Sequence, residues 1–450
     1  MARVTDMTHG RPIRLILLFS LPLMLGSVFQ QLYTIVDTII IGRGVGMQAL
    51  ASIGAADWIN WLVLWGLQGF TQGFAILAAQ EFGAGAYDRL RRVLAMIVKL
   101  SCWFGIAVTI ISLLLVRPLL TLLRTDPAVF GGAQTYLYVQ FGGSLIIIAY
   151  NMAAAVLRCL GDSRTPLFAI IAASFANIAL DLLFVMGFGW GIFGASFATV
   201  LAQLIAFLLC LRSLRRLPFV QLTKADWKTD PAILLHLCRL GIPTGLQMSM
   251  ITLGGMVLQS VLNGFGVVFV AGYTAANKLY GILESASVAF GYAMTAYMGQ
   301  NRGARNAARM DAGIRAVLAL SAGFTAAIVM AMLLAGKPLL GLFLSTEEAG
   351  AADALAVAHR YLMVLMAFLL ALFVLQAYRS SLQGLGEMTV PTLSGFAEML
   401  MRMGAALVLP VFIGKSGVFF AEGAAWVCAA ALNLVWYYIR IGKIKREMMQ

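Results

Sequence analysis

Long runs of apolar residues, separated by short polar stretches, fill most of the sequence. A run of about 20 apolar residues crosses the hydrocarbon core of a bilayer as an α-helix. A transmembrane β-barrel is excluded, because its strands alternate apolar and polar residues and have a lower hydropathy. The pattern predicts an all-α polytopic membrane protein with twelve transmembrane helices, at residues 14–42, 51–79, 93–116, 129–157, 166–187, 191–212, 237–262, 270–298, 312–335, 357–380, 391–412 and 417–440.

The composition strengthens this prediction. Of the 450 residues, 61% are hydrophobic and only 11% are charged, and the mean hydropathy is +0.90. A soluble domain is roughly 45–50% apolar and about 25% charged, so a soluble enzyme is excluded. The cysteines form no CxxC pair and the histidines have no metal-ligand spacing, so we expect no transition metal, no other cofactor and no enzymatic activity.

The net charge of +13 is a topology signal rather than a nucleic-acid signal. Most of the 32 Lys and Arg residues lie at the two termini and in the even-numbered loops, which therefore share one side of the membrane. Because basic residues are retained on the cytoplasmic side, both termini are predicted to be cytoplasmic. No basic patch suggests a nucleic-acid partner, and we expect a monomer embedded in lipid.

The sequence repeats itself at an offset of 220–225 residues. Segment 20–22 (Ser-Leu-Pro) matches 241–243 (Gly-Ile-Pro), and 160–162 (Leu-Gly-Asp) matches 385–387 (Leu-Gly-Glu). Six helices per half predict a parallel repeat, two bundles with a cleft between them, and transport by alternating access. The expected domains are an N-terminal lobe, a cytoplasmic linker and a C-terminal lobe, at residues 1–211, 212–239 and 240–450.

Four polar residues lie at one depth in three separate predicted helices. They are Asp37, Asn177, Asp181 and Thr199, each within about 8–15 Å of the outer boundary at 1.5 Å per residue. Ionisable groups inside a bilayer are costly and suggest function. These oxygens suit H⁺ or a small cation such as Na⁺. The alternative is that each group only caps or bridges helices.

Other intramembrane residues are less specific. Glu398 and Arg402 are spaced i, i+4, which predicts an ion pair within one helix. The repeat places Arg402 opposite Asn177, so we infer that the coupling ion binds in the N-terminal half only. A substrate role and a structural role are both open for this pair and for Glu284. Pro22 predicts a kink, either a coupling hinge or a static bend.

Taken together, these motifs resemble the multidrug and toxic compound extrusion (MATE) family. The resemblance implies a bacterial inner-membrane antiporter that exports organic cations or other amphiphiles in exchange for H⁺ or Na⁺. It implies that the family's cation site falls on Asp37, Asn177, Asp181 and Thr199, and its helix 1 hinge on Pro22. Some members have an acidic residue where this chain has Ile251. We expect the substrate cleft to include Gln30, Tyr33, Glu284, Glu398 and Arg402.

A flippase for a lipid-linked precursor is the alternative function. A pyrophosphate-binding cleft should contain a basic cluster, and the predicted helices contain none, which favours the exporter. An intramembrane enzyme would need a nucleophile or a metal-binding constellation, and the sequence shows neither.

Overall fold

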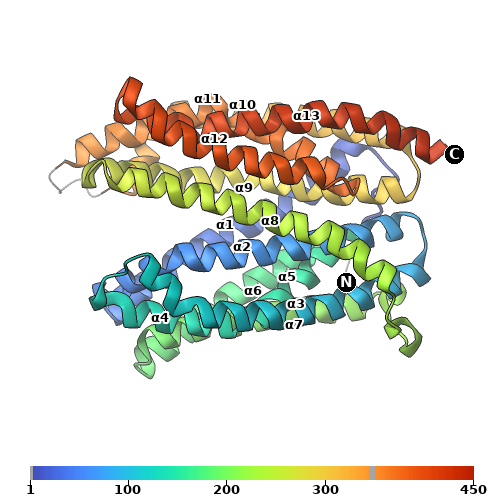
Figure 1. Ribbon diagram of the computed structural model, residues 1–450, viewed down its shortest axis with the longest axis horizontal. Helices are drawn as coiled ribbons and strands as arrows, with labels where there is room; N and C mark the ends of the chain where they lie inside the picture. Colours follow the sequence, from blue (N-terminus) through green and yellow to red (C-terminus); the bar gives the residue numbers. More distant parts are fainter. Residues whose placement is uncertain (1–3, 345–349, 450) are drawn as a thin grey trace. The chain divides into compact units, whose positions relative to one another are not determined.

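The computed structural model describes residues 4–344 and 350–449, and within these ranges the chain is all α-helical (Figure 1). The α-helices are α1 (Pro12–Gly44), α2 (Met47–Gly83), α3 (Tyr87–Leu122), α4 (Pro127–Gly142), α5 (Ser144–Cys159), α6 (Arg164–Asp181), α7 (Gly191–Arg215), α8 (Pro231–Asn263), α9 (Val267–Gly303), α10 (Ala307–Gly341), α11 (Ala351–Gly384), α12 (Thr389–Ile413) and α13 (Phe420–Met449).

The twelve predicted transmembrane helices correspond to these elements. Ten helices are long and apolar enough to cross a membrane, and the α4–α5 pair, bent by 50°, forms another span. Helix α9 covers the remaining predicted span, although its polar residues lower its hydropathy. The chain is therefore a multi-pass membrane protein.

The bend between α4 and α5 follows from a glycine pair at residues 142 and 143. A Cβ atom on Gly143 would lie 2.5 Å from a methyl carbon of Val200 on α7, so only glycine fits this close approach. Glycine also weakens the helix, which explains why the break occurs here. The corresponding helix of the second half, α11, is continuous over 34 residues.

The internal repeat is visible in the lengths of the helices. Helices α2 and α9 both have 37 residues, and α1 and α8 both have 33. Gly46 and Gly266, which precede α2 and α9, both have positive φ angles, of 109° and 96°. The two halves therefore share the lengths of these helices and the glycine turn between them.

The chain forms two compact units. The N-terminal unit contains Leu21–Gly245, and the C-terminal unit contains Met7–Ser20 together with the chain from Leu246 onwards. Helix α1 changes unit next to Pro22, and α8 changes unit next to Pro243, at matching positions of the repeat. The lobe boundaries expected at residues 211 and 240 stay a prediction.

The predicted linker, residues 212–239, is shorter in the structure because α7 and α8 extend into it. Between them lie two short 3₁₀ turns, η2 (Pro218–Val220) and η3 (Lys224–Trp227). The Nζ of Lys99 donates to the carbonyl of Trp227 at 2.5 Å and to the hydroxyl of Thr229 at 2.8 Å. This segment therefore packs on α3 within the N-terminal unit, and Lys99 holds it there.

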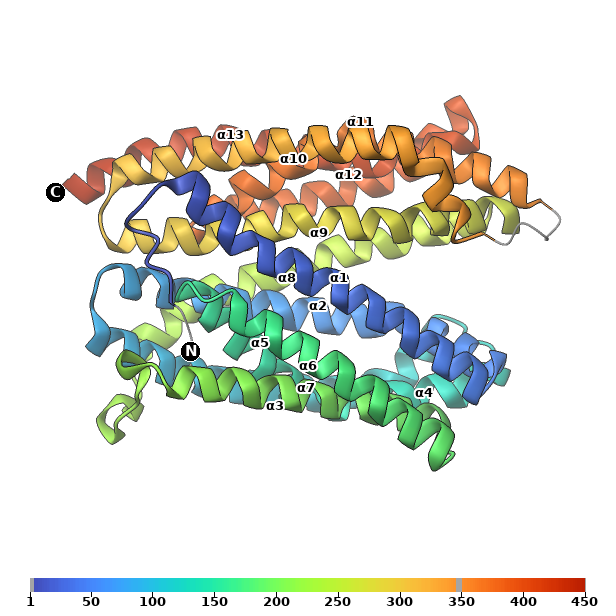
Figure 2. The ribbon, with the colours of Figure 1, turned by 180° about the vertical axis from the view of Figure 1, so that it is seen from behind.

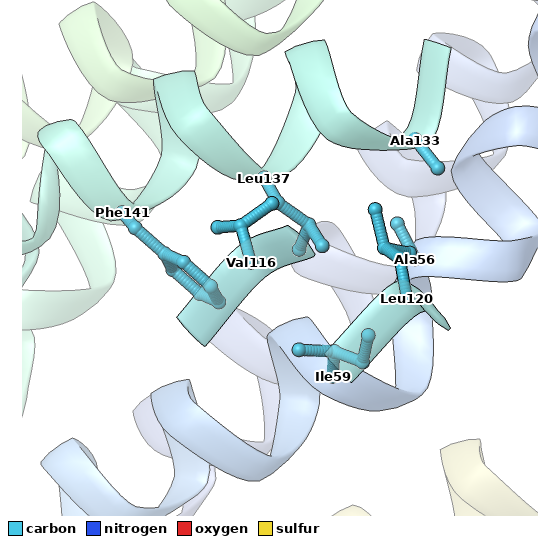
Figure 3. Close-up of a cluster of buried hydrophobic side chains, with 7 residues drawn as sticks. All are labelled: Ala56, Ile59, Val116, Leu120, Ala133, Leu137 and Phe141. Carbon is cyan, nitrogen blue, oxygen red and sulfur yellow. The ribbon is translucent and has the colours of Figure 1, made fainter. Parts of the chain in front are cut away.

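A buried apolar cluster joins α2, α3 and α4 in the N-terminal unit (Figure 3). It consists of Ala56, Ile59, Val116, Leu120, Ala133, Leu137 and Phe141. Helices α5, α6 and α7 lie side by side in the view from behind (Figure 2). This agrees with the contacts that α7 makes with α5 and with α6. This packing fixes α2 and α4 relative to each other, and both helices contribute to the site described next.

Candidate functional site

The structure brings Asp37 and Asp181 together from two helices of the N-terminal unit. Their carboxyl groups are close enough for the two acids to interact. Asp181 is fully buried and Asp37 is half-buried. Two ionised carboxylates have no hydrogen to share and repel each other, so this contact is favourable only when one of them carries a proton.

A second apolar cluster holds these two acids in place. Ile40, Ile41, Ala49, Val185 and Ala195 are buried together, and Val36 and Ile178 pack against them. Val36 immediately precedes Asp37, and Ile178 lies between Asn177 and Asp181. The core therefore fixes the backbone on either side of each acid.

Asp181 is the last residue of α6, and a π-helix, η1 (Leu182–Gly187), begins directly after it. The wider π turn shifts the backbone relative to an α-helix, and such turns are frequent at functional sites. Gly44 at the end of α1 packs against this turn, because a Cβ atom there would lie 2.9 Å from Val185. The π-helix therefore joins the ends of the two helices that carry the acids.

Asn177 lies one turn before Asp181 and is also buried. Neither polar atom of its side chain, and neither carboxylate oxygen of Asp181, has a hydrogen-bond partner in the described ranges. Buried polar atoms are normally paired, so unpaired ones need an explanation such as an ion, a proton or a water molecule. These atoms are the strongest sign in the structure that the site takes a ligand.

The sequence analysis did not predict that Asp57, Asn60 and Tyr136 would lie near Asp37. Asp57 on α2 is close enough to Asp37 for their charges to interact. Tyr136 on α4 interacts with Asp57 and Asp37 and accepts a hydrogen bond from Asn60 at 3.3 Å. Their i, i+3 spacing places Asp57 and Asn60 on one face of α2, and this is the signal that could have revealed them.

The structure also gives the surroundings of Tyr33, Gln30 and Thr199, which were predicted to belong to the substrate cleft or the cation site. Tyr33, expected in the substrate cleft, lies close enough to Asp37 and Asp181 to interact with both. Gln30 is exposed. The hydroxyl of Thr199 donates to the carbonyl of Ala195 in its own helix at 3.2 Å, and its place in the cation site stays a prediction.

The C-terminal unit contains a second buried charge cluster. The ion pair predicted between Glu398 and Arg402 is confirmed, with an N–O distance of 3.2 Å. Arg379 on α11 binds the other oxygen of Glu398 at 2.5 Å. Arg402 also binds Glu422 on α13 at 2.8 Å and donates to the carbonyl of Ile251 at 2.9 Å.

Arg379 and Glu422 were not predicted to belong to this cluster. The side chain of Arg379 is only 5% exposed and is paired inside the C-terminal unit. Glu422 was not singled out by the sequence analysis. Both lie near the ends of predicted helices, where a charge is usually solvated.

Glu284 on α9 lies next to this cluster. Its carboxylate is close enough to interact with Tyr280, one turn earlier, and with Glu422, Arg402 and Glu398. No described ion pair includes Glu284. The acids predicted to lie inside the membrane, Asp37, Asp181, Glu284 and Glu398, thus all belong to one of these two clusters.

Comparisons with known proteins agree with this architecture. The MatE family model matches residues 22–183 and again 243–408, once in each half of the repeat. The chain is 32% identical to the probable multidrug resistance protein YpnP of Bacillus subtilis, covering 98% of this chain and 97% of YpnP. It is 27% identical to YoeA of the same organism, covering 96% and 94%.

Solved structures have the same fold. A MOP superfamily transporter from Pyrococcus furiosus superposes with a TM-score of 0.91 at 24% identity, covering 98% of this chain and 99% of that one. With the two matched repeats and the full-length relatives, this likeness leads to one conclusion: the chain belongs to the MatE family of multidrug efflux transporters.

Proposed function

We propose that this protein is a secondary active antiporter of a bacterial cytoplasmic membrane, which exports organic cations or other amphiphilic compounds in exchange for protons. The observation that carries the proposal is the contact of Asp37 with Asp181 in a buried site that has no basic partner in the described ranges. A proton satisfies this contact, and an incoming cation can displace it.

Protons fit the site better than Na⁺. A proton can be shared by Asp37 and Asp181 alone, whereas a metal cation needs several oxygen ligands. Na⁺ remains the alternative coupling ion, for which the carbonyl of Asn177 and the hydroxyl of Thr199 would have to join the acids. We expect no other cofactor and no transition metal.

Ion binding can be coupled to a change of conformation at this site. Without a proton, repulsion between Asp37 and Asp181 favours separation of α1 from α6, and with a proton the hydrogen bond favours their contact. Pro22, fifteen residues earlier on α1, offers a hinge because proline lacks the backbone hydrogen bond that would stiffen the helix. Alternating access then follows from two states with different proton affinities. We propose that both termini are cytoplasmic and that the protein acts as a monomer.

A lipid-linked flippase is less well supported. The buried arginines of the C-terminal unit, Arg379 and Arg402, are already bound by carboxylates, so they offer no free basic cluster for a pyrophosphate. The relatives named above are described as multidrug resistance proteins.

Transport in proteoliposomes tests this proposal. Wild-type protein would be given ethidium as the organic cation, with either a pH gradient or a Na⁺ gradient as the driving force. We expect pH-driven transport, and its loss to background in Asp37→Asn. Asp88→Asn, which changes an exposed acid at the start of α3, is the control and should transport normally. Transport driven only by Na⁺, or unchanged transport in Asp37→Asn, would contradict the proposal.

A further inference from the structure

We propose that residues 5–10, here called the strap, tether the two compact units to each other, and that one end of the strap is released in each transport cycle. This inference rests on the proposed function, because it adds a gate to the same alternating-access cycle. It also gives a role to two repeated motifs that the cation site does not use. These are 160–162 (Leu-Gly-Asp) and 300–304 (Gln-Asn-Arg-Gly-Ala), of which the second corresponds to 80–84 (Gln-Glu-Phe-Gly-Ala).

The C-terminal unit binds the strap through the end of α9 and the start of α10. The side chain of Gln300 accepts a hydrogen bond from the backbone N–H of Met7 at 2.8 Å, and Asn301 donates to the carbonyl of Met7 at 3.2 Å. The guanidinium of Arg309 donates to the carbonyls of Met7, at 2.9 Å, and Gly10, at 2.8 Å. The side chain of Met7 is fully buried. These hydrogen bonds and the buried side chain make a strong joint.

The arginine of this joint belongs to a pair that recurs in both halves. The Nε of Arg309 donates to Asn301 at 3.0 Å, and at the corresponding positions the Nε of Arg89 lies 3.0 Å from a carboxylate oxygen of Glu81. An ionised carboxylate only accepts hydrogen bonds, whereas an amide also donates them. The asparagine of the second copy therefore supplies the donor that the carbonyl of Met7 needs.

The N-terminal unit binds the strap at Thr5, over the turn between α5 and α6. The backbone N–H of Thr5 donates to the carbonyl of Gly161 at 3.2 Å. A Cβ atom on Gly161 would overlap the backbone carbonyl of Thr5, so a side chain at this position would displace the strap. One hydrogen bond of this length is weaker than the contacts of Met7 and Gly10, so this is the joint that opens first.

The two joints are separated by very little chain. Each joint lies within one unit, and the chain passes from the first unit to the second between Asp6 and Met7. An extended chain spans at most about 3.3–3.6 Å per residue. Alternating access in a repeat transporter moves one bundle against the other. A movement that draws Gly161 away from the residues that bind Met7 by more than this short span must therefore break a joint.

Distances between two spin labels, measured by double electron–electron resonance in lipid nanodiscs, test the inference. The labels replace Ala84 after α2 and Ala304 after α9, which are exposed and correspond in the repeat, in protein whose five native cysteines are changed to serine. We expect Gly161→Ala to raise the population with the longer distance roughly two- to tenfold, as for the loss of one hydrogen bond. Gly189→Ala is the matched control, because Gly189 also has a positive φ but a Cβ atom there meets nothing within 4 Å.

A second variant weakens the other joint. Arg309→Gln removes the hydrogen bonds of the guanidinium to the strap and should also raise the population with the longer distance. Arg89→Gln changes the corresponding arginine of the first half, which pairs with Glu81, and should leave the distances unchanged. The same shift from joints in two different units would show that neither result is a local defect of one turn.

The strap and the proposed function can fail separately. If neither Gly161→Ala nor Arg309→Gln shifts the distances, while unlabelled wild type transports ethidium in response to a pH gradient, the strap is refuted and the proposed antiport stands. If both variants shift the distances but wild type transports no ethidium, the strap stands as a tether and the proposed function fails. An equal shift in Gly189→Ala or Arg89→Gln would also refute the strap.

Discussion

The two halves of this protein handle buried acids in opposite ways. The N-terminal unit gathers Asp37, Asp57 and Asp181 without an ion-pair partner in the described ranges. The C-terminal unit also gathers three acids but supplies Arg379 and Arg402 to neutralise them. The repeat places Arg402 of the C-terminal cluster opposite Asn177 of the N-terminal cluster, so the same helical framework carries a different side chain at this position. Whether a buried carboxylate can exchange a cation is thus decided by the arginines beside it.

The largest expected effect is on transport, and it should follow from placing an arginine, as found in the C-terminal cluster, beside the acids of the N-terminal cluster. The repeat places Asn177 opposite Arg402, so Asn177→Arg should introduce a fixed guanidinium beside Asp37 and Asp181. Both acids would then stay ionised, and pH-driven ethidium transport should fall to background. Asn177→Met, similar in size but uncharged, is the control for crowding and should retain more transport. Equal transport by the two variants would show that charge is not the deciding difference between the halves.

Removing an arginine from the C-terminal cluster should lower the stability of the folded protein. Arg402→Ala leaves Glu398 and Glu422 short of a partner, and breaking a buried ion pair costs roughly 3–5 kcal/mol. Thermal melting of the purified protein in detergent should therefore shift strongly, whereas the protein that folds should keep its pH-driven transport. Normal melting combined with lost pH dependence would assign ion coupling to the C-terminal unit and reverse the comparison.

The smallest expected effect is on the local stability of the segment between α7 and α8, which contains Asp226. Burial disfavours the charged form of Asp226, but hydrogen bonds from the backbone and hydroxyl of Thr223 and the charge of Arg91 prevail and hold the pKa of its carboxyl below the usual range. A lowered pKa stabilises the fold above the ordinary carboxyl pKa, and this contribution is lost as the pH falls through the lowered value.

Asp226→Ala should remove this capping interaction at a cost of about 0.5–2 kcal/mol. Limited proteolysis between α7 and α8 at neutral pH should become faster, with transport unchanged. Acidification should narrow the difference between variant and wild type, and a difference that widens on acidification would mean that Asp226 does not act through its charge.

The sequence was sufficient for the helices and for part of each cluster. Long apolar runs locate membrane helices because the thickness of the bilayer sets their length. Depth alone brought Asp37 and Asp181 into one hypothesis, and i, i+4 spacing identified Glu398 with Arg402. Contacts across helices could not be found in this way, since the pairing of Arg402 with Glu422 depends on how α12 packs against α13.

Local departures from regular helix were also beyond the sequence. Nothing in the apolar pattern distinguishes residues 182–187, which form the π-helix, from an ordinary α-helical end. The bend at Gly143 is similar, because glycines are common in membrane helices and most of them do not cause a break. Both features depend on neighbouring side chains, which the linear pattern does not record.

The exchange of α1 and α8 between compact units has a consequence for fragments of this protein. A cut in the segment between α7 and α8 divides the polypeptide into its two repeats, but each fragment would lack a piece of helix that completes its unit, residues 7–20 for the second and Pro231–Gly245 for the first. The fragments should therefore be insoluble or unstable when produced separately and should recover transport only when made together. A gene duplication that created this chain would have joined two copies that were already bound by their exchanged helices.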